Sequence, residues 1–365
     1  MDNTHVLARR EGRLGHITLN RPKALNALNT EMVRGVYAAL TEWADDPGVD
    51  AVLLDGAGER GFCAGGDIRL MHDSARGDHG LAQQFWREEY ALDALIANYP
   101  VPVVGIMDGI TMGGGIGLTG HAAVRVVTER SVLAMPEVDI GLAPDVGGSL
   151  LLARAPGELG THMALTAARI GARDALATGF ADHFVPAARL QELAEALRAP
   201  GADKPDHVVA ALAGQPPESP DDLVAHRAWI DACYGADTVE EILARLRERP
   251  EPAAAAAAEA LLAGSPTSVK VTLRALRNAR AMATVEECLV QDYRLCSHFL
   301  DSHDLPEGVR AMVIDKDRSP RWSPDRLEAV TDAAVEAYFT TLGADELRLH
   351  PPLGGAGPLP PGAGS

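Results

Sequence analysis

Two acidic residues, Glu137 and Asp145, lie eight residues apart in a segment that is otherwise mostly apolar residues, glycine and proline. A carboxylate in such surroundings can attack a carbonyl carbon, or it can take a proton from water as a general base. If both acids line one apolar pocket, their pKa values should move apart, which suits a division into acid and base. The structural alternative is a surface turn, because Pro and Gly residues surround both acids.

Two loops of small residues could each offer a backbone N–H group to the same ligand atom. The first is FCAGGDI (62–68), and the second is GGGIGLTG (113–120). N–H groups at the start of a helix have no partner within that helix, so two such loops can together form an oxyanion hole. Either loop taken alone is more simply explained as a tight turn.

The second loop also matches G-x-G-x-x-G at residues 115–120, and Glu137 lies 20 residues after Gly117. That combination is typical of a dinucleotide-binding turn. We reject this interpretation, because the segment DGITMG intervenes between the apolar run 101–107 and the match. Glu137 also follows two short strands instead of ending the second strand of a βαβ unit.

A third acid, Glu89, lies on an apolar stripe of the helix expected over residues 81–98. The stripe consists of Leu81, Phe85, Leu92 and Ile96 at helical spacing, and Glu88 lies at its edge. A carboxylate on such a stripe should be paired or should face a polar cavity. An ion pair with Arg69 or Arg87 and a role in a site both remain open.

The elements that must position these residues are short strands alternating with helices. Apolar and β-branched runs predict strands at residues 14–19, 51–55, 101–107, 124–128 and 131–135. Asn29 is expected to cap a helix whose Met32, Val33, Val36, Tyr37, Leu40 and Trp43 recur at helical spacing. Ser265 followed by Pro266 marks another helix start. Pairs of strands separated by single helices predict a mixed α/β fold.

Composition limits the function classes. The 365 residues include 33 Lys and Arg against 51 Asp and Glu, and the net charge of −18 argues against a nucleic-acid binder or a basic membrane surface. No run of 18 apolar residues predicts a membrane span, and the first 13 residues lack the apolar core of a secretory signal. Four scattered cysteines without a CxxC pair favour free thiols in the cytoplasm. Twelve scattered histidines without a ligand-like pair predict no metal.

Four segments resemble the crotonase (enoyl-CoA hydratase/isomerase) superfamily: NRPKALNAL (20–28), FCAGGDI (62–68), GITMGGGIGL (109–118) and MPEVDIGLAPDVGG (135–148). Three later segments are most similar to its 3-hydroxyisobutyryl-CoA hydrolase branch: SPTSVKVTLRAL (265–276), EECLVQDYRL (286–295) and HDLPEGVRAMVIDKDRSPRW (303–322). The resemblance, which spans roughly residues 10–340, implies an α/β spiral of ββα units with a helical C-terminal region. It also implies hydrolysis of 3-hydroxyisobutyryl-CoA in valine breakdown. Neither a metal nor a cofactor is implied, since coenzyme A is part of the substrate.

We therefore expect an acyl-CoA core at residues 1–195, a helical region at 196–342 and a disordered tail at 343–365. The tail is Pro/Gly-rich, and residues 351–365 carry no charged side chain. A soluble protein that binds acyl-CoA, and neither nucleic acid nor membrane, is expected. Assembly into a homo-oligomer is left open.

The resemblance assigns catalytic roles to four residues. Gly66 and Gly114 match the oxyanion-hole donors, Glu137 matches the catalytic glutamate, and Asp145 matches the aspartate beside the acyl group. Substrate-binding positions are Glu89, which matches an acyl-site glutamate, Lys23 at the nucleotide end, Ala64, Asp67 and Ile68. Asp139 matches no functional position and is expected to be structural.

Two alternatives to hydrolysis are weighed. True hydratases place a second catalytic glutamate where this chain has Gly117, so an enoyl-CoA hydratase or isomerase is disfavoured. A non-catalytic acyl-CoA-binding protein would have no need of both Glu137 and Asp145. A basic stripe of Lys270, Arg274, Arg277 and Arg280 is either a solvated face or a contact to a CoA phosphate, and its role stays open.

Overall fold

The computed structural model describes residues 4–199, 201, 203–219 and 222–349. The main sheet has the strand order β1-β2-β3-β5-β7-β9. Its strands are β1 (Val6–Glu11), β2 (Leu14–Leu19), β3 (Ala51–Gly56), β5 (Val103–Met107), β7 (Val124–Val127) and β9 (His183–Phe184). Strands β1 and β2 are antiparallel, and the other neighbours are parallel. A second sheet contains the parallel strands β4 (Gly61–Cys63), β6 (Ile110–Met112) and β8 (Val132–Ala134).

The chain passes repeatedly from the first sheet to the second and then into a helical segment. Strands β3 and β4 precede α2 (Ile68–Ala75) and α3 (His79–Ala97), and β5 and β6 precede α4 (Gly114–Gly120). Strands β7 and β8 precede the 3₁₀ turn Glu137–Ile140 and α5 (Gly148–Arg154). This arrangement agrees with the expected ββα units. One detail differs: the segment DGITMG, expected to be a connection, contains β6, which pairs with β4 and β8.

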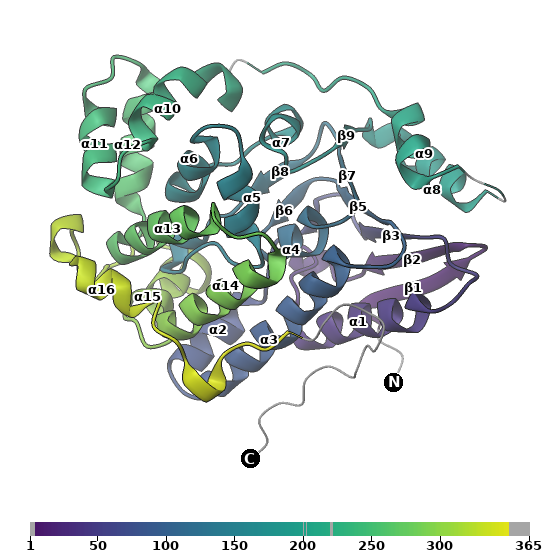
Figure 1. Ribbon diagram of the computed structural model, residues 1–365, viewed down its shortest axis with the longest axis horizontal. Helices are drawn as coiled ribbons and strands as arrows, with labels where there is room; N and C mark the ends of the chain where they lie inside the picture. The colour runs from purple at the N-terminus through teal and green to yellow at the C-terminus, as the bar shows by residue number, and fades with distance from the viewer. Residues whose placement is uncertain (1–3, 200, 202, 220–221, 350–365) are drawn as a thin grey trace.

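The remaining helices surround this core (Figure 1). They are α1 (Thr30–Ala44), α6 (Leu159–Thr166), α7 (Ala172–Thr178), α8 (Leu190–Arg198), α9 (Pro205–Leu212), α10 (Arg227–Tyr234), α11 (Val239–Arg247), α12 (Pro252–Ala263), α13 (Pro266–Ala279), α14 (Val285–Phe299), α15 (Asp304–Val309) and α16 (Asp332–Ala337). A π-helical turn, Arg310–Ile314, follows α15.

Local sequence signals explain several helix starts. The Asn29 side chain accepts a hydrogen bond of 2.9 Å from the Met32 N–H, and the Ser265 hydroxyl accepts one of 3.2 Å from the Ser268 N–H. Both residues are therefore N-caps, as their positions before an apolar helix predicted. Helix α14 begins with a reciprocal capping box between Thr284 and Glu287.

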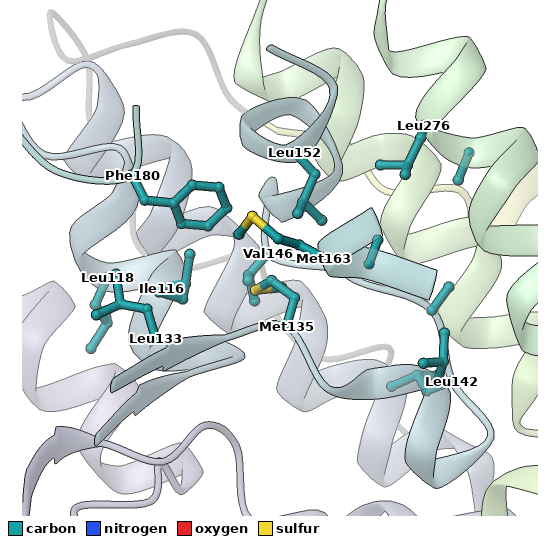
Figure 2. Packing of buried hydrophobic residues seen from close by; sticks show 14 of the residues in the cluster. Ile116, Leu118, Leu133, Met135, Leu142, Val146, Leu152, Met163, Phe180 and Leu276 are labelled. Atoms are coloured by element: carbon teal, nitrogen blue, oxygen red, sulfur yellow. The ribbon is translucent and has the colours of Figure 1, made fainter. Parts of the chain in front are cut away.

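A continuous apolar core joins the second sheet to the helices. Figure 2 shows Met135, Val146 and Met163 close together, and Leu276 of α13 belongs to the same core cluster. These four side chains are at most 2% exposed, so the segment with Glu137 and Asp145 is anchored on both sides by buried residues. Glu137 and Asp145 therefore do not lie in a surface turn, which was the structural alternative for this segment.

The C-terminal end differs from the expected tail. Residues 343–349 pack against α3 and α14: Leu347 is buried, and the Glu346 carboxylate accepts a hydrogen bond from Arg294. Burial of Leu347 and the ion pair of Glu346 offset the loss of conformational entropy that would otherwise favour a disordered tail. The rest of the expected tail, residues 350–365, lies outside the residues that the structure describes. It contains the segment 351–365, which has no charged side chain. The boundary expected at 195/196 falls inside α8. Within the described chain, no helix is long and apolar enough to span a membrane.

Candidate active site

A cavity of about 210 Å³ brings the predicted site residues together. It is lined by seven of the nine expected residues: Ala64, Gly66, Ile68, Glu89, Gly114, Glu137 and Asp145. Apolar walls come from residues distant in sequence, namely Met71, Phe85, Trp86, Met112, Leu142 and Met312. The three carboxyl groups therefore face a small and largely apolar space.

Two loop N–H groups beside this cavity are free to bind a ligand. A Cβ atom built on Gly114 would lie 3.4 Å from the Gly66 nitrogen, so the two loops are in close contact. The first loop is fixed by 2.8 Å bonds from the Leu28 N–H to the Gly65 carbonyl and from the Asp67 N–H to the Leu28 carbonyl. Within the described chain, neither Gly66 nor Gly114 donates its N–H to a protein acceptor. Both donors can therefore bind one carbonyl oxygen.

The glycines of residues 113–117 let carboxyl groups lie directly against the backbone. A Cβ at Gly113, which has φ +48°, would lie 3.1 Å from Oε1 of Glu137. A Cβ at Gly114 would overlap with Oε1 of Glu89. Larger residues at either position would displace an acid from the cavity, so the glycine run is a requirement of the site.

Burial dominates the ionisation of the cavity acids. It raises the pKa of Glu137 and of Glu89 well above the usual range, and the charge of Asp145 raises both further. Burial also raises the pKa of Asp145, to about 6, but hydrogen bonds from the Tyr90 hydroxyl and the Cys296 thiol oppose the rise. Asp145 is therefore the cavity acid that ionises most readily among these three.

Adjacent residues Glu88 and Glu89 have different surroundings. Glu88 forms a bidentate ion pair with Arg34, with both N···O distances at 2.6 Å. Among the residues that the structure describes, Glu89 has no ion-pair partner, and its buried Oε1 has no hydrogen-bond partner. Neither Arg69 nor Arg87 pairs with it; the Arg87 guanidinium lies over the Tyr293 ring at 4.5 Å. Of the two explanations left open for Glu89, the structure therefore favours the polar cavity.

Two expected substrate-binding residues lie away from the cavity. Lys23 is exposed in the loop before α1, where Arg60 donates hydrogen bonds to the Pro22 and Lys23 carbonyls. Asp67 forms an ion pair with Arg21 at 3.3 Å and begins α2. Its carboxylate thus joins the segments 20–28 and 62–68.

The basic stripe of α13 is largely used in ion pairs. Lys270 pairs with Glu240, Arg274 pairs with Glu336, and both Arg277 and Arg280 bind Glu158. These contacts join α13 to α11, α16 and the start of α6. The stripe is thus partly a structural network and not a free solvated face.

Asp139, Arg169 and Met312 are among the cavity residues that were not assigned to the site from the sequence. Asp139, expected to be structural, lines the cavity together with the exposed Arg169. Burial raises the pKa of Asp139 to about 6, although the Arg169 charge opposes this. Met312 enters from the π-helical turn, 175 residues after Glu137. The position of Asp139 between two site acids could have indicated that it lines the cavity, whereas nothing in the sequence indicates this for Arg169 or Met312.

Known proteins match this chain over nearly its whole length. The enoyl-CoA hydratase/isomerase family matches residues 14–339. A rat protein named 3-hydroxyisobutyryl-CoA hydrolase, mitochondrial, is 42% identical and aligns with 95% of this chain and 92% of its own.

Two solved structures are also similar. A carnitinyl-CoA dehydratase from Mycobacterium thermoresistibile is 48% identical, with a TM-score of 0.90 and coverage of 95% of this chain and 99% of its own. An enoyl-CoA hydratase from Rhodobacter sphaeroides is 44% identical, with a TM-score of 0.87 and coverage of 94% and 100%. With the ββα architecture and the cavity, these similarities show that the chain belongs to the enoyl-CoA hydratase/isomerase family.

Proposed function

We propose that this chain hydrolyses 3-hydroxyisobutyryl-CoA to 3-hydroxyisobutyrate and coenzyme A, a step of valine breakdown. One observation carries the chemistry: two unpartnered loop N–H groups and three buried carboxyl groups meet at one small apolar cavity. The curated relatives named 3-hydroxyisobutyryl-CoA hydrolase support the substrate.

The oxyanion hole supplies the first part of the mechanism. The thioester carbonyl oxygen accepts hydrogen bonds from the Gly66 and Gly114 N–H groups, which makes the carbonyl carbon more electrophilic. Negative charge develops on this oxygen in the transition state, and one such donor is typically worth ~10²–10³ in rate. The apolar walls of the cavity strengthen both interactions, because they lower the local dielectric constant.

Glu137 supplies the nucleophile by one of two balanced routes. In the first, its carboxylate attacks the carbonyl carbon, the C–S bond breaks, and water then hydrolyses the resulting anhydride. In the second, Glu137 takes a proton from water, hydroxide attacks, and the tetrahedral intermediate expels the thiolate. In both routes the thiolate gains one proton, and the net reaction consumes one water molecule.

The other two acids divide the remaining tasks. Asp145, fixed by Tyr90, accepts a hydrogen bond from the substrate 3-hydroxyl. Burial raises the pKa of Glu89 as it raises that of Glu137, so Glu89 can hold a proton and donate it to the departing thiolate, while Glu137 reacts in its ionised form. No step requires a metal or an added cofactor, and we expect hydrolysis to continue in the presence of a chelator.

One assay separates hydrolysis from its alternatives. Thiol release from 3-hydroxyisobutyryl-CoA is measured beside hydration of crotonyl-CoA, because two similar solved structures are named a carnitinyl-CoA dehydratase and an enoyl-CoA hydratase. We expect rapid thiol release and negligible hydration, since Gly117 offers no second glutamate. Hydration at an equal or higher rate would identify a hydratase. Binding of the CoA ester with neither reaction would identify a non-catalytic binder.

The cellular compartment and the oligomeric state of the protein are predictions that need their own experiments. The four cysteines are free and buried, which suits a reducing compartment, and we propose the cytoplasm. The names of the rat and human relatives include the word mitochondrial, so fractionation of the native cells should be compared with marker enzymes of both compartments. Light scattering on the purified chain would show whether it forms a homo-oligomer.

A further inference from the structure

A fourth buried acid, Asp93, lies one helical turn after Glu89 on α3. It is 0% exposed and does not line the cavity. Neither of its carboxyl oxygens has a hydrogen-bond partner in the part of the chain that the structure describes. A buried carboxylate without a donor is very costly, so this group must be satisfied in another way.

Helix α4 confines Asp93 from the other side. A Cβ built on Gly117 would lie 2.8 and 2.9 Å from the Asp93 carboxyl oxygens, and 2.8 Å from Cβ of Val146. Glu89 makes the corresponding contact with Gly114 one turn earlier. Two carboxyl groups of α3 are therefore packed against two glycines of α4, and any side chain at Gly117 would displace Asp93.

The charged groups that act on Asp93 are all acids. They are Glu89 on α3 itself, Asp145 in the segment before α5, and Asp292 on α14. Asp145 receives a hydrogen bond from the Tyr90 hydroxyl at 2.7 Å, and Asp292 receives one from the Gly147 N–H at 2.9 Å. Asp93 receives none. The Tyr90 donor favours the ionised form of Asp145, whose pKa burial raises only to about 6. Burial raises the pKa of Asp292 well above its usual range in spite of the Gly147 bond, and Asp93, which has no donor within the described chain, is left to carry a proton.

We propose that Asp93 is a positioning residue that holds a proton behind Glu89 while the enzyme is active, and that loss of this proton at alkaline pH stops hydrolysis. A neutral Asp93 supports Glu89 without adding charge. An ionised Asp93 adds a negative charge beside Glu89 and Asp145, which opposes the negative charge that develops in the transition state. The activity part of this proposal depends on the proposed function, and the protonation part does not.

Thermal unfolding tests the protonation without any substrate. Burial and the neighbouring acids raise the pKa of Asp93 in the folded chain above that of the unfolded chain. The folded state then binds more protons than the unfolded state, so Asp93 lowers stability increasingly as the pH rises above about 4. Asp93→Asn removes this contribution. The Tm of the variant relative to the native chain should therefore increase by at least ~2 °C between pH 5 and pH 8.

Two further variants make this test decisive. Asp73→Asn, on α2 with a side chain 78% exposed, should show no such pH-dependent gain. Asp93→Ala should show the same gain if Asp93→Asn does not fold. Equal pH slopes of Tm for the native chain and a folded Asp93 variant would overturn the proposal.

Turnover tests the second part. The native kcat should fall on the alkaline side, by about tenfold for each pH unit beyond the midpoint. Asp93→Asn should keep its neutral kcat and lose it only at a higher pH than the native chain, because Glu89 must still hold its proton. Superimposable pH profiles, or no alkaline fall up to pH about 9.5 in the native chain, would refute the switch. A native chain that hydrolyses nothing would refute the proposed function alone, because the Tm comparison would still stand.

Discussion

The Tyr90 hydroxyl donates a hydrogen bond of 2.7 Å to Oδ2 of Asp145, and both side chains are buried. Tyr90 directly follows Glu88 and Glu89 on α3. Successive helical residues point about 100° apart, so the three side chains point in different directions. Glu88 pairs with Arg34, Glu89 lines the cavity, and Tyr90 donates to Asp145. One helix therefore carries the cavity acid Glu89 and holds a second cavity acid, Asp145, in place.

Loss of the Tyr90 hydroxyl should change the pH dependence of activity. Asp145 must be ionised to accept the substrate hydroxyl, so kcat/KM should rise as the pH increases through the Asp145 pKa of about 6. Tyr90→Phe removes a donor to the carboxylate, which raises that pKa and moves the acid limb upward by about 1 pH unit. The pH–rate profile of the purified variant measures this shift.

Tyr99→Phe is the matched control, since the Tyr99 hydroxyl donates to the Leu40 carbonyl at 2.6 Å, away from the cavity. Its acid limb should coincide with that of the native chain. If Tyr90→Phe also left the limb in place, Asp145 would not be the group that controls it.

The charge of Glu137 should be essential for turnover. Glu137→Gln keeps the size of the side chain but removes both nucleophilic and basic character, so kcat should fall by at least ~10²-fold while CoA binding is retained. Because burial raises the pKa of the native carboxyl, the neutral variant should melt no lower than the native chain at pH 8. Native turnover in a folded Glu137→Gln variant would exclude the catalytic role.

The pair Glu88 and Glu89 offers a comparison within one helix. Glu89→Gln should reduce kcat, because the amide cannot give a proton to the departing thiolate, and should leave stability unchanged or higher. Glu88→Gln should lower stability by ~1–2 kcal/mol through the weakened Arg34 contact and leave kcat unchanged. Urea unfolding and turnover are measured on both variants. Lost turnover in Glu88→Gln with normal turnover in Glu89→Gln would show that Glu88, and not Glu89, takes part in the reaction.

The two donor glycines should differ in their tolerance of a methyl group. In Gly114→Ala the added carbon overlaps with Glu89 and lies 3.1 Å from Leu28, so the donor or the acid must move. A loss of ~10²–10³ in kcat is expected for a displaced donor. In Gly66→Ala the added carbon reaches only Phe85, at 3.4 Å, and Met71, so most activity should remain. Full activity in Gly114→Ala would show that its backbone does not bind the substrate oxygen.

The sequence predicted the strand pairs, the helix caps and the family, because each has a local signature. Asn29 and Ser265 cap their helices, and the strand predicted at 14–19 is β2 with the same bounds. Seven of nine expected site residues line one cavity, since motif residues in this fold lie at strand and helix ends that meet there.

Long-range partners could not be predicted. Nothing near Glu88 in the sequence indicates Arg34, and nothing near Asp145 indicates that Tyr90 supports it. Asp93 shares the helical face of Glu89, but its confinement by Gly117 depends on how α3 and α4 pack. Similarly, helical periodicity predicted the basic stripe of α13, but it could not show that Glu158, Glu240 and Glu336 would form ion pairs with the stripe.

The position of Met312 in the cavity wall has a consequence for protein synthesis. Residues from Ala64 to Met312 contribute to this one enclosure, so a ribosome must finish most of the chain before the cavity closes. A nascent chain that ends before α15 has its acids and glycine loops but lacks that wall. The acidic centre consequently stays open to water until α15 has been synthesised, and a premature stop just before α15 removes the closure while sparing the sheets.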